Sequence, residues 1–430
     1  MQLSPRRSRG FRVRFFAFVV VVAVGALTRA TPAAAADEPA SAERDSASEK
    51  SASEKKEPAA ATRPADTSTK RASLEFASYK DSDHITVITP SITGRVENVT
   101  TGASISGSYL LDVVSAASVD IVSTASRRWQ ESRHAGAIGG EYKPKNFGVA
   151  VSGSASREPD YFAYGFAVQM SQDFDEKNTS IVGGYGYGHD TIGRGSTPFS
   201  VFSREVNRGT FNGGITQVIN RTTVAGLSFD LMIENGDQSK PYRYIPMFTS
   251  AVAANVPKGA SIDYVTSHRS PERPLEQLPL SRRRLATTGR IAHRFEGSTL
   301  RASERIYFDT WGLSASTTDA RWVFDVVPRV SLGPHTRFHI QSPVSFWQRA
   351  YTSSGQGWSI PEFRTGDREL GPLWTVTGGG GVKVNIGSAA EPRKWAIGLD
   401  ADAMYTSFLN DLYLTSRTGL LGAMTLEAEL

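Results

Sequence analysis

From Arg71 to the C-terminus, apolar and polar residues alternate with a period of two, and no segment keeps the 3.6-residue stripe of an amphipathic helix. Residues 160–173 give the clearest example. There, small and polar residues separate five apolar ones, namely Phe162, Tyr164, Phe166, Val168 and Met170. Alternation of this kind predicts β-strands that have one apolar face and one polar face.

Three features distinguish these segments from the strands of a soluble β-sandwich. Many of them are twelve or more residues long, whereas strands of globular sheets usually have about five or six. Their polar faces are rich in Gly, Ser, Thr and Arg, as a water-filled lumen requires. Aromatic residues lie near the strand ends, as in the girdles of membrane barrels: Tyr161, Trp311, Phe346, Trp374, Trp395 and Tyr405.

The pattern therefore predicts an all-β fold, a closed antiparallel transmembrane β-barrel of about sixteen strands, with fourteen strands as the alternative. The strands that we expect are 71–80, 84–97, 102–112, 133–143, 146–157, 160–173, 178–189, 206–219, 222–234, 284–295, 298–311, 319–332, 335–351, 372–386, 392–407 and 418–430.

The connections between these segments alternate in length. Every second one is short, as at 144–145, 220–221 and 333–334, and the opposite set includes 113–132, 190–205, 235–283 and 352–371. Short periplasmic turns opposite long external loops are typical of a bacterial outer-membrane barrel with both termini in the periplasm.

The N-terminus predicts export. Residues 1–36 combine an arginine-rich start, the 13-residue apolar run 15–27 and a small-residue exit at 33–36. This is the organisation of a signal peptide, and the run is short for a membrane-spanning helix. Residues 37–70 contain no Val, Ile, Leu, Phe, Tyr or Trp. We therefore expect a disordered periplasmic linker there and a barrel over 71–430.

The net charge of +5 belongs to the signal peptide. Residues 1–36 contain six arginines and no acidic residue, which leaves 42 basic against 43 acidic residues in the rest of the chain. The basic balance therefore gives no reason to expect a nucleic-acid partner. The chain has no cysteine, which excludes disulfides, thiolate metal sites, a catalytic thiol and a lipidated N-terminal cysteine.

Arginines on the inner face are the main candidates for function. A barrel of about sixteen strands leaves an aqueous channel, in which wall cations would favour anionic solutes. In the expected registers nine arginines point inward: Arg284, Arg290, Arg294, Arg301, Arg305, Arg321, Arg329, Arg337 and Arg349. In the alternative, they pair with lumenal acids such as Asp230, Glu234, Asp400, Asp402 and Glu427. Glu304 would face lipid, so we expect a bulge or a shallow position there.

The connection 235–283 is too long for a plain turn, and connections of this length are usually functional or mobile. It carries Tyr242, Arg243, Tyr244 and Phe248. One hypothesis is that these residues fold back and constrict the pore. The alternative is that the loop covers the outer mouth.

The pattern favours neither catalysis nor metal or cofactor binding. The seven histidines are scattered, and His335 and His339 are four residues apart, a spacing that suits a helix rather than a strand pair. The pairs Asp83-His84 and His189-Asp190 lie at expected external strand ends, but adjacent Asp and His are frequent by chance. We expect no catalytic residue, no metal site and no cofactor.

Several segments resemble the family of bacterial outer-membrane proteins called domain of unknown function 3570. The resemblance covers about residues 71–430, with Gly in the family pattern where this chain has Ala116. The segments are 112–120 (DVVSAASVD), 158–161 (EPDY), 171–179 (SQDFDEKNT), 216–218 (TQV), 240–243 (KPYR), 272–274 (ERP) and 307–312 (YFDTWG).

The resemblance implies an outer-membrane barrel, and similar proteins tend to be encoded near a flavin transferase and a thioredoxin-like protein. Two functions stay open: a porin-like channel for small solutes, with anions favoured, and a structural barrel that sheathes a periplasmic redox or secretion partner. The expected partners are outer-membrane lipids, lipopolysaccharide and the barrel-assembly machinery, which reads a C-terminal strand that here ends in Leu430 instead of an aromatic residue.

Overall fold

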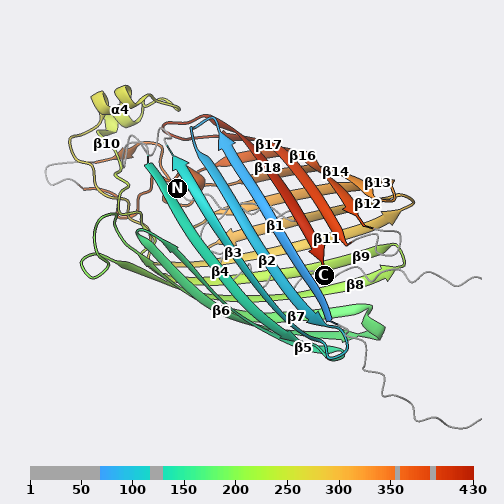
Figure 1. The fold of residues 1–430 in the computed structure, drawn as a ribbon. Helices are drawn as coiled ribbons and strands as arrows, with labels where there is room; N and C mark the ends of the chain where they lie inside the picture. The colour runs from blue at the N-terminus through green and yellow to red at the C-terminus, as the bar shows by residue number, and fades with distance from the viewer. Residues whose placement is uncertain (1–67, 117–128, 354–358, 388–393) are drawn as a thin grey trace, which may run out of the picture.

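The computed structural model describes residues 68–116, 129–353, 359–387 and 394–430. Sixteen strands form one closed barrel in which every strand pairs antiparallel with its neighbours in sequence and the first strand pairs with the last (Figure 1). The expected fold class and strand number are confirmed. The expected signal peptide and nearly all of the expected linker lie outside the described residues. The last three linker residues, 68–70, belong to the first strand, so the barrel begins at Ser68 instead of Arg71.

The barrel strands, in chain order, are β1 (Ser68–Asp81), β2 (Thr86–Asn98), β3 (Ala103–Ala116), β4 (Trp129–Tyr142), β5 (Phe147–Glu158), β6 (Tyr161–Phe174), β7 (Thr179–Ile192), β8 (Arg204–Asn220), β9 (Thr223–Gly236), β11 (Ser281–Phe295), β12 (Ser298–Asp309), β13 (Ser314–Val327), β14 (Val330–Gln341), β16 (Leu373–Ile386), β17 (Trp395–Phe408) and β18 (Ser416–Glu429). The connections hold the short strands β10 (Met247–Phe248) and β15 (Tyr351–Thr352), the helices α3 (Ser250–Ala253) and α4 (Ile262–His268), and the 3-10 turns η1 (Asp175–Lys177) and η2 (Arg368–Leu370).

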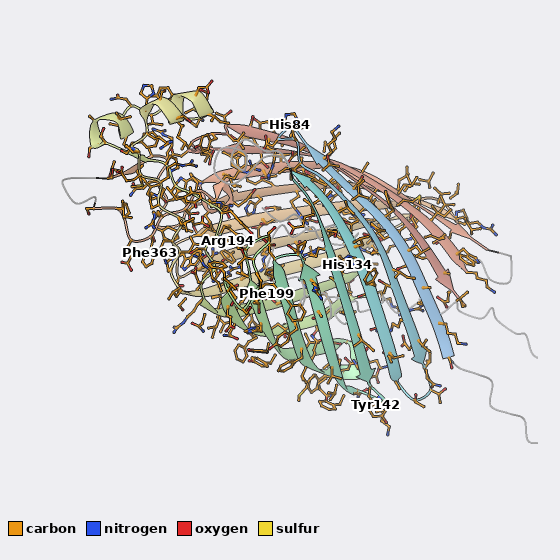
Figure 2. The ribbon with its side chains drawn as sticks, turned by 60° about the vertical axis from the view of Figure 1, so that its left-hand side comes forward. His84, His134, Tyr142, Arg194, Phe199 and Phe363 are labelled. Atoms are coloured by element: carbon orange, nitrogen blue, oxygen red, sulfur yellow. The ribbon has the colours of Figure 1, made fainter. Side chains whose placement is uncertain are left out.

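The two ends of the barrel differ. One end carries the short connections, including 143–146, 221–222 and 296–297, together with the C-terminus. The other end carries the long connections, and β10 and α4 lie beyond the strands there (Figure 1). Tyr142 marks the short-turn end, whereas Arg194 and Phe363 mark the long-loop end (Figure 2). We call these ends periplasmic and external, following the rule for outer-membrane barrels.

Strand faces follow the alternation in the sequence. Phe162, Tyr164 and Phe166 of β6 are 38–52% exposed on the outside, whereas the intervening Ala163 and Ala167 face inward and are buried. Trp374, Trp395 and Tyr405 lie on the outer face as expected. Because the outer face is a belt of apolar and aromatic residues around a closed sheet, the protein is an outer-membrane barrel.

Three of the six residues expected in the aromatic girdles lie elsewhere. Tyr161 faces inward and donates a hydrogen bond to Asp190. Trp311 is buried in a cluster at the external end, and Phe346 packs against that cluster. Aromatic residues near strand ends thus also serve the packing of external loops, which position along a strand does not reveal.

Glu304 faces outward without a bulge, because the pairing of β12 with both neighbours is continuous through it. Its carboxylate accepts hydrogen bonds from Ser316 at 2.6 Å and Thr318 at 2.5 Å, both on the outer face of β13. Hydroxyl donors on the adjacent strand, and not the expected bulge, therefore offset the cost of the carboxylate.

The turn between β13 and β14 lies at Pro328-Arg329 and not at the expected Gly333-Pro334. Pro334 is inside β14, opposite Gly380 of β16. On its other side the β13–β14 pairing stops at Arg321–His335 and resumes at Phe324–Leu332. Proline lacks a backbone donor, so the interruption of the ladder on that side accommodates it.

In the described part of the chain, no helix has the length and apolar character needed to cross a membrane.

Candidate functional site: the lumen and its external cap

The inner wall has two chemically different halves. On β3 to β7 most inward residues at mid-height are small and uncharged. The small residues are Ser104, Ser106, Ser108, Ala135, Ala137, Gly139, Ala150, Ser152, Ser154, Ala163, Gly165, Ala167, Gly184, Gly186 and Gly188. Leu110 and Gln169 are larger inward residues of the same strands, and Glu141 lies opposite Ser104. We call this half the small-residue wall.

The other half, from β8 to β18, carries arginines, aspartates and glutamates, and we call it the charged wall. Near the external end its side chains form one chain of ion pairs. Arg208 bonds Asp190 at 2.8 Å and Glu234 at 3.2 Å, and Arg284 bonds the second oxygen of Glu234 at 2.7 Å. Four strands are cross-linked in this way, and Glu234 is fully buried.

Lower in the barrel, arginine side chains lie along the wall. Arg305 of β12 passes over β11 and reaches Asp230 of β9 at 3.0 Å. Arg321 of β13 passes over two strands to Asp400 of β17 at 3.3 Å. The residues that it crosses are Gly333 and Gly381, which have no side chain to block it. Glycines on the inner face therefore make room for long-range ion pairs.

A buried histidine is part of the charged wall. The His335 Nε2 lies 3.0 Å from Asp319, and its Nδ1 lies 3.4 Å from Asp402. Arg337 bonds the same Asp319 oxygen as His335, at 2.8 Å. Four strands, β13, β14, β16 and β17, meet around this network. The sequence analysis missed this network, since no motif links Asp319, His335 and Asp402. Only the strand alternation, which places all three side chains on the inner face, could have suggested it.

Seven of the nine candidate arginines point into the lumen: Arg284, Arg290, Arg294, Arg301, Arg305, Arg321 and Arg337. Arg329 lies instead in the turn between β13 and β14, because that turn is five residues earlier than expected. Arg349 lies in the external connection before β16 and donates to Asn410 at 3.0 Å. Neither residue belongs to the wall, contrary to the expected registers.

The five acids considered as partners all bind a lumenal cation or histidine. Arg284 pairs with Glu234, Arg305 with Asp230 and Arg321 with Asp400, as described above. Lys383 binds Glu427 at 2.7 Å, and Asp402 contacts His335. Most of the basic charge on the wall is therefore compensated by neighbouring acids along the wall.

Arg290 and Arg301 are different. Within the described residues neither guanidinium has an acidic partner, and Arg301 lies directly opposite Arg321, another cation. Arg290 is exposed to the lumen and Arg301 is half-buried. The uncompensated positive charge of the wall is thus concentrated on β11 and β12.

The external connections interlock in a cap over the mouth. Tyr242 donates to Asp160 of the β5–β6 turn at 2.7 Å and accepts from the Gly195 amide. On the other side of the same connection, the Ala260 amide donates to the Leu412 carbonyl oxygen at 2.6 Å. The connection 237–280 therefore reaches both the β5–β6 turn and the β17–β18 loop.

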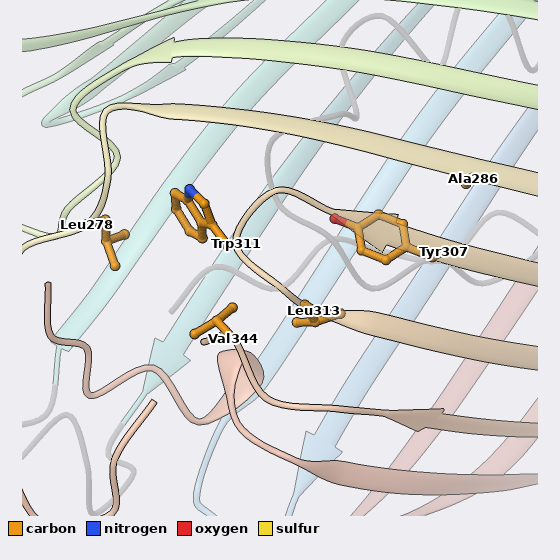
Figure 3. Packing of buried hydrophobic residues seen from close by; sticks show 6 residues of the cluster. All are labelled: Leu278, Ala286, Tyr307, Trp311, Leu313 and Val344. Carbon is orange, nitrogen blue, oxygen red and sulfur yellow. The ribbon is translucent and has the colours of Figure 1, made fainter. Parts of the chain in front are cut away.

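The cap has its own apolar core. Phe248, Val256, Val265 and Leu412 are buried together, and β10 pairs with β15. At its base, Trp311 lies near Leu278 and Val344, where the ends of β11, β12 and β13 meet the loops (Figure 3). Packed side chains of this kind make the cap a folded unit and not a set of separate loops.

Charged groups also hold the cap together. Arg243 binds Glu276 at 3.0 Å and Asp367 at 3.1 Å. Burial disfavours the charged form of Asp367, but the guanidinium of Arg243 and the amide of Glu369 outweigh it and lower the pKa of this carboxyl to about 2. Burial and the hydrogen bond to Asp160 raise the pKa of Tyr242 to about 12.

The four loop residues proposed to constrict the pore lie in this cap. Tyr242 and Arg243 form the polar contacts above, Tyr244 is exposed, and Phe248 is fully buried in the apolar core. The segment that enters the mouth is η2 of another connection. Gln341 and Arg417, both on the inner wall, bind the Glu369 carbonyl oxygen at 2.9 Å and its carboxylate at 3.2 Å.

Neither Asp-His pair forms a dyad. His189 and Asp190 are consecutive in β7, so His189 points outward to Asn207, whereas Asp190 points inward to Arg208. Asp83 pairs with Arg368 of η2 at 3.2 Å. Among the described residues, one group of three carboxylates is close enough to share a cation, with oxygens within 4.8 Å of one another: Glu131, Glu158 and Asp160.

Comparison with known proteins gives one family and a set of distant barrels. The profile of a family described as "Protein of unknown function (DUF3570)" matches residues 24–426. No curated protein sequence matches the chain. Among solved structures, the siderophore receptor PirA from Acinetobacter baumannii is 10% identical with a TM-score of 0.40, over 80% of this chain and 54% of the receptor.

Two further structures are similar to the same extent. CdiB from Acinetobacter baumannii is 10% identical with a TM-score of 0.44, over 84% of this chain and 60% of that one. OccK11 (OpdR) from Pseudomonas aeruginosa is 10% identical with a TM-score of 0.39, over 84% and 96%. The chain spans between half and two thirds of the length of the first two.

Proposed function

The chain belongs to the DUF3570 family, and from its lumen we propose that it is an outer-membrane channel for small solutes in which anions are favoured over cations. The observation that carries this proposal is the arrangement of the two walls. Ion-paired side chains lie along one wall, and the other wall carries mostly glycine, alanine and serine at mid-height. A sixteen-strand ring with such walls has room for water.

Anion preference follows from the charges that remain after pairing. The acids of the charged wall are each bound to a neighbouring cation or histidine, whereas Arg290 and Arg301 have no acidic partner among the described residues. Fixed positive charge in a narrow aqueous passage lowers the entry energy of anions. We also expect no catalytic activity, because His189 and Asp190 point to opposite faces of β7 and Asp83 is paired with Arg368.

The folded cap favours a second candidate function. Its interlocked connections leave the external mouth covered, which suits a structural barrel that sheathes a periplasmic redox or secretion partner. In this alternative the protein alone is silent in conductance measurements and co-purifies with the partner. For the channel to conduct, solute must pass between the loops or the cap must open.

Planar-bilayer recording of the refolded mature protein distinguishes the two functions. A channel gives stepwise currents whose reversal potential in a KCl gradient indicates anion preference, and this preference weakens at high salt because screening increases. Absence of current from protein that shows the folded, heat-modifiable band on gels would exclude the channel proposal.

The cap is tested by Tyr242→Phe, which removes the hydrogen bond to Asp160 and leaves the ring. The loss of about 1 kcal/mol makes opening of the cap roughly five times more frequent. Open probability in bilayers and cleavage by external protease should both rise. Tyr244→Phe, an exposed position in the same segment, is the matched control and should change neither.

A further inference from the structure

We propose that Arg290 and Arg301 form a binding site for small oxyanions, such as phosphate or carboxylates, on the lumen wall between β11 and β12. The proposal deepens the proposed channel function and rests on it, because the site takes its ligand from the water of the lumen.

The two arginines lie on the inner face of adjacent strands, close to each other in the strand register. Arg290 lies opposite Ser303, and Arg301 lies opposite Ala292, so the two are diagonal neighbours across the same strand pair. Diagonal neighbours in an antiparallel pair are about 7–8 Å apart at Cα. Side chains as long as arginine can therefore converge on one ligand, with the small residues Ser303 and Ala292 between them.

Neighbouring acids are engaged by other cations. Asp319, which lies opposite Ser303, binds Arg337 and His335, and Asp400 binds Arg321. Asp325, nearer the periplasmic end, binds Arg294 at 2.6 Å. The structure thus places two arginines at diagonal positions of one strand pair, while the carboxylates that could neutralise them are bound to other cations.

The chemistry of guanidinium selects the ligand class. The two parallel N–H donors of its planar group match the two oxygens of phosphate and carboxylate, whereas a halide ion offers a single acceptor atom. Arg301 also faces Arg321 directly. A bound oxyanion would relieve this repulsion between like charges, so the site should bind a doubly charged anion more tightly than chloride.

The test uses inorganic phosphate as the probe. In bilayers, phosphate added to the periplasmic side should reduce the chloride current in a saturable manner. Arg290→Gln and Arg301→Gln should each raise the phosphate concentration needed for half-maximal block on the order of tenfold, because each removes a guanidinium and its charge-assisted hydrogen bonds. Arg301→Lys, which keeps the charge and loses the two parallel donors, should fall between the wild type and Arg301→Gln.

Arg294→Gln is the matched control. It removes one lumenal positive charge, as the other two variants do. Arg294 is the diagonal neighbour of Arg301 on the other side, but its guanidinium is already paired with Asp325. The site predicts that Arg294→Gln shifts chloride selectivity and leaves the saturable phosphate block unchanged. Equal loss of the block in Arg294→Gln and Arg301→Gln, or a block that never saturates, would overturn the proposal.

Equilibrium binding separates this proposal from the channel function. The ³¹P line width of phosphate, measured with the folded protein in detergent, should increase with the wild type and with Arg294→Gln, and much less with Arg301→Gln. Binding with this pattern in a protein that conducts no current would support the site and contradict the channel. Identical line widths for all variants would refute the site even if the protein conducts.

Discussion

The two walls of the lumen both present a polar surface to the inside of the closed sheet, but they are built from different side chains. At mid-height the small-residue wall meets water mainly with hydroxyl, methyl and backbone groups, and its side-chain bonds between strands, such as Arg133 to Asp112 and Tyr161 to Asp190, join adjacent strands. The charged wall adds bonds between strands up to three positions apart in the barrel, such as Arg321 to Asp400. The difference suggests that one wall sets the width of the lumen and the other sets its charge and rigidity.

The lipid-facing residues behind the two walls differ in size at some positions. Behind the small-residue wall, β6 and β7 present large aromatic residues to lipid, including Phe166, Tyr185 and Tyr187. Behind part of the charged wall the outer face is small instead, with Gly380, Ala401 and Gly422 lining a shallow hollow. Large residues such as Trp322 and Trp395 also lie on the outer face of the charged wall, so the contrast between the two outer faces is local to this hollow.

The largest effect should come from breaking the ion-pair chain of the charged wall. Glu234→Ala leaves Arg208 and Arg284 buried without their shared acid, which should lower the free energy of unfolding by about 3–5 kcal/mol. Urea titration of the folded, heat-modifiable band measures this loss. Glu429→Ala, in a half-exposed pair with Arg71, should cost at most about 1 kcal/mol. Equal losses of unfolding free energy in the two variants would mean that the buried chain of ion pairs stabilises the barrel no more than an exposed pair does.

An added methyl group should be tolerated at Gly139 of the small-residue wall and should destabilise the barrel at Gly379 of the charged wall. At Gly379 an added Cβ would clash with the Ala401 carbonyl oxygen and with Asp402, whereas at Gly139 its nearest contact is 3.4 Å. Overpacking against backbone costs about 1–3 kcal/mol, so Gly379→Ala should be destabilised by this amount. Gly139→Ala should keep or slightly raise stability. The same urea titration measures both, and tolerance at Gly379 would show that β16 and β17 can separate.

The smallest effect on stability, but a clear one on conductance, is expected on the small-residue wall. Ser154→Tyr inserts a ring where serine faces Gly165, which should narrow the lumen and lower single-channel conductance without destabilising the barrel. Val151→Tyr on the outer face of the same strand is the control and should leave conductance unchanged. Unchanged conductance in Ser154→Tyr would mean that the narrowest part of the passage lies elsewhere, with the cap as the first candidate.

The strand pattern predicted the barrel because alternation is a local property. The alternate apolar residues from Phe162 to Met170 face lipid, as the sequence indicated. The inward direction of Arg284, Arg301 and Arg337 followed from the alternation of side chains along each strand alone. The turn at Pro328-Arg329 was missed because Gly333-Pro334 is the stronger local turn signal. A gap in the ladder that lets proline stay inside β14 depends on the neighbouring strand.

The candidate site was predicted in part. The sequence named both the arginines and several of their acids, but which cation meets which acid depends on strand order, register and the glycines between them. Arg321 reaches Asp400 across β14 and β16, at a separation of 79 residues along the chain. The position of η2 in the mouth and the core of the cap depend on contacts between separate loops, for which the sequence has no periodic signal.

By itself, the sequence determined a closed barrel of about sixteen strands, its lipid-facing and lumenal sides and the end at which its long connections lie, because a period of two and the length of connections are carried by neighbouring residues. The tertiary structure alone decided that most lumenal arginines are neutralised along the wall, that Arg290 and Arg301 lack acidic partners among the described residues, and that the external connections form one cap. Charge compensation and loop packing are properties of distant segments brought together, and closing the ring is what brings them together.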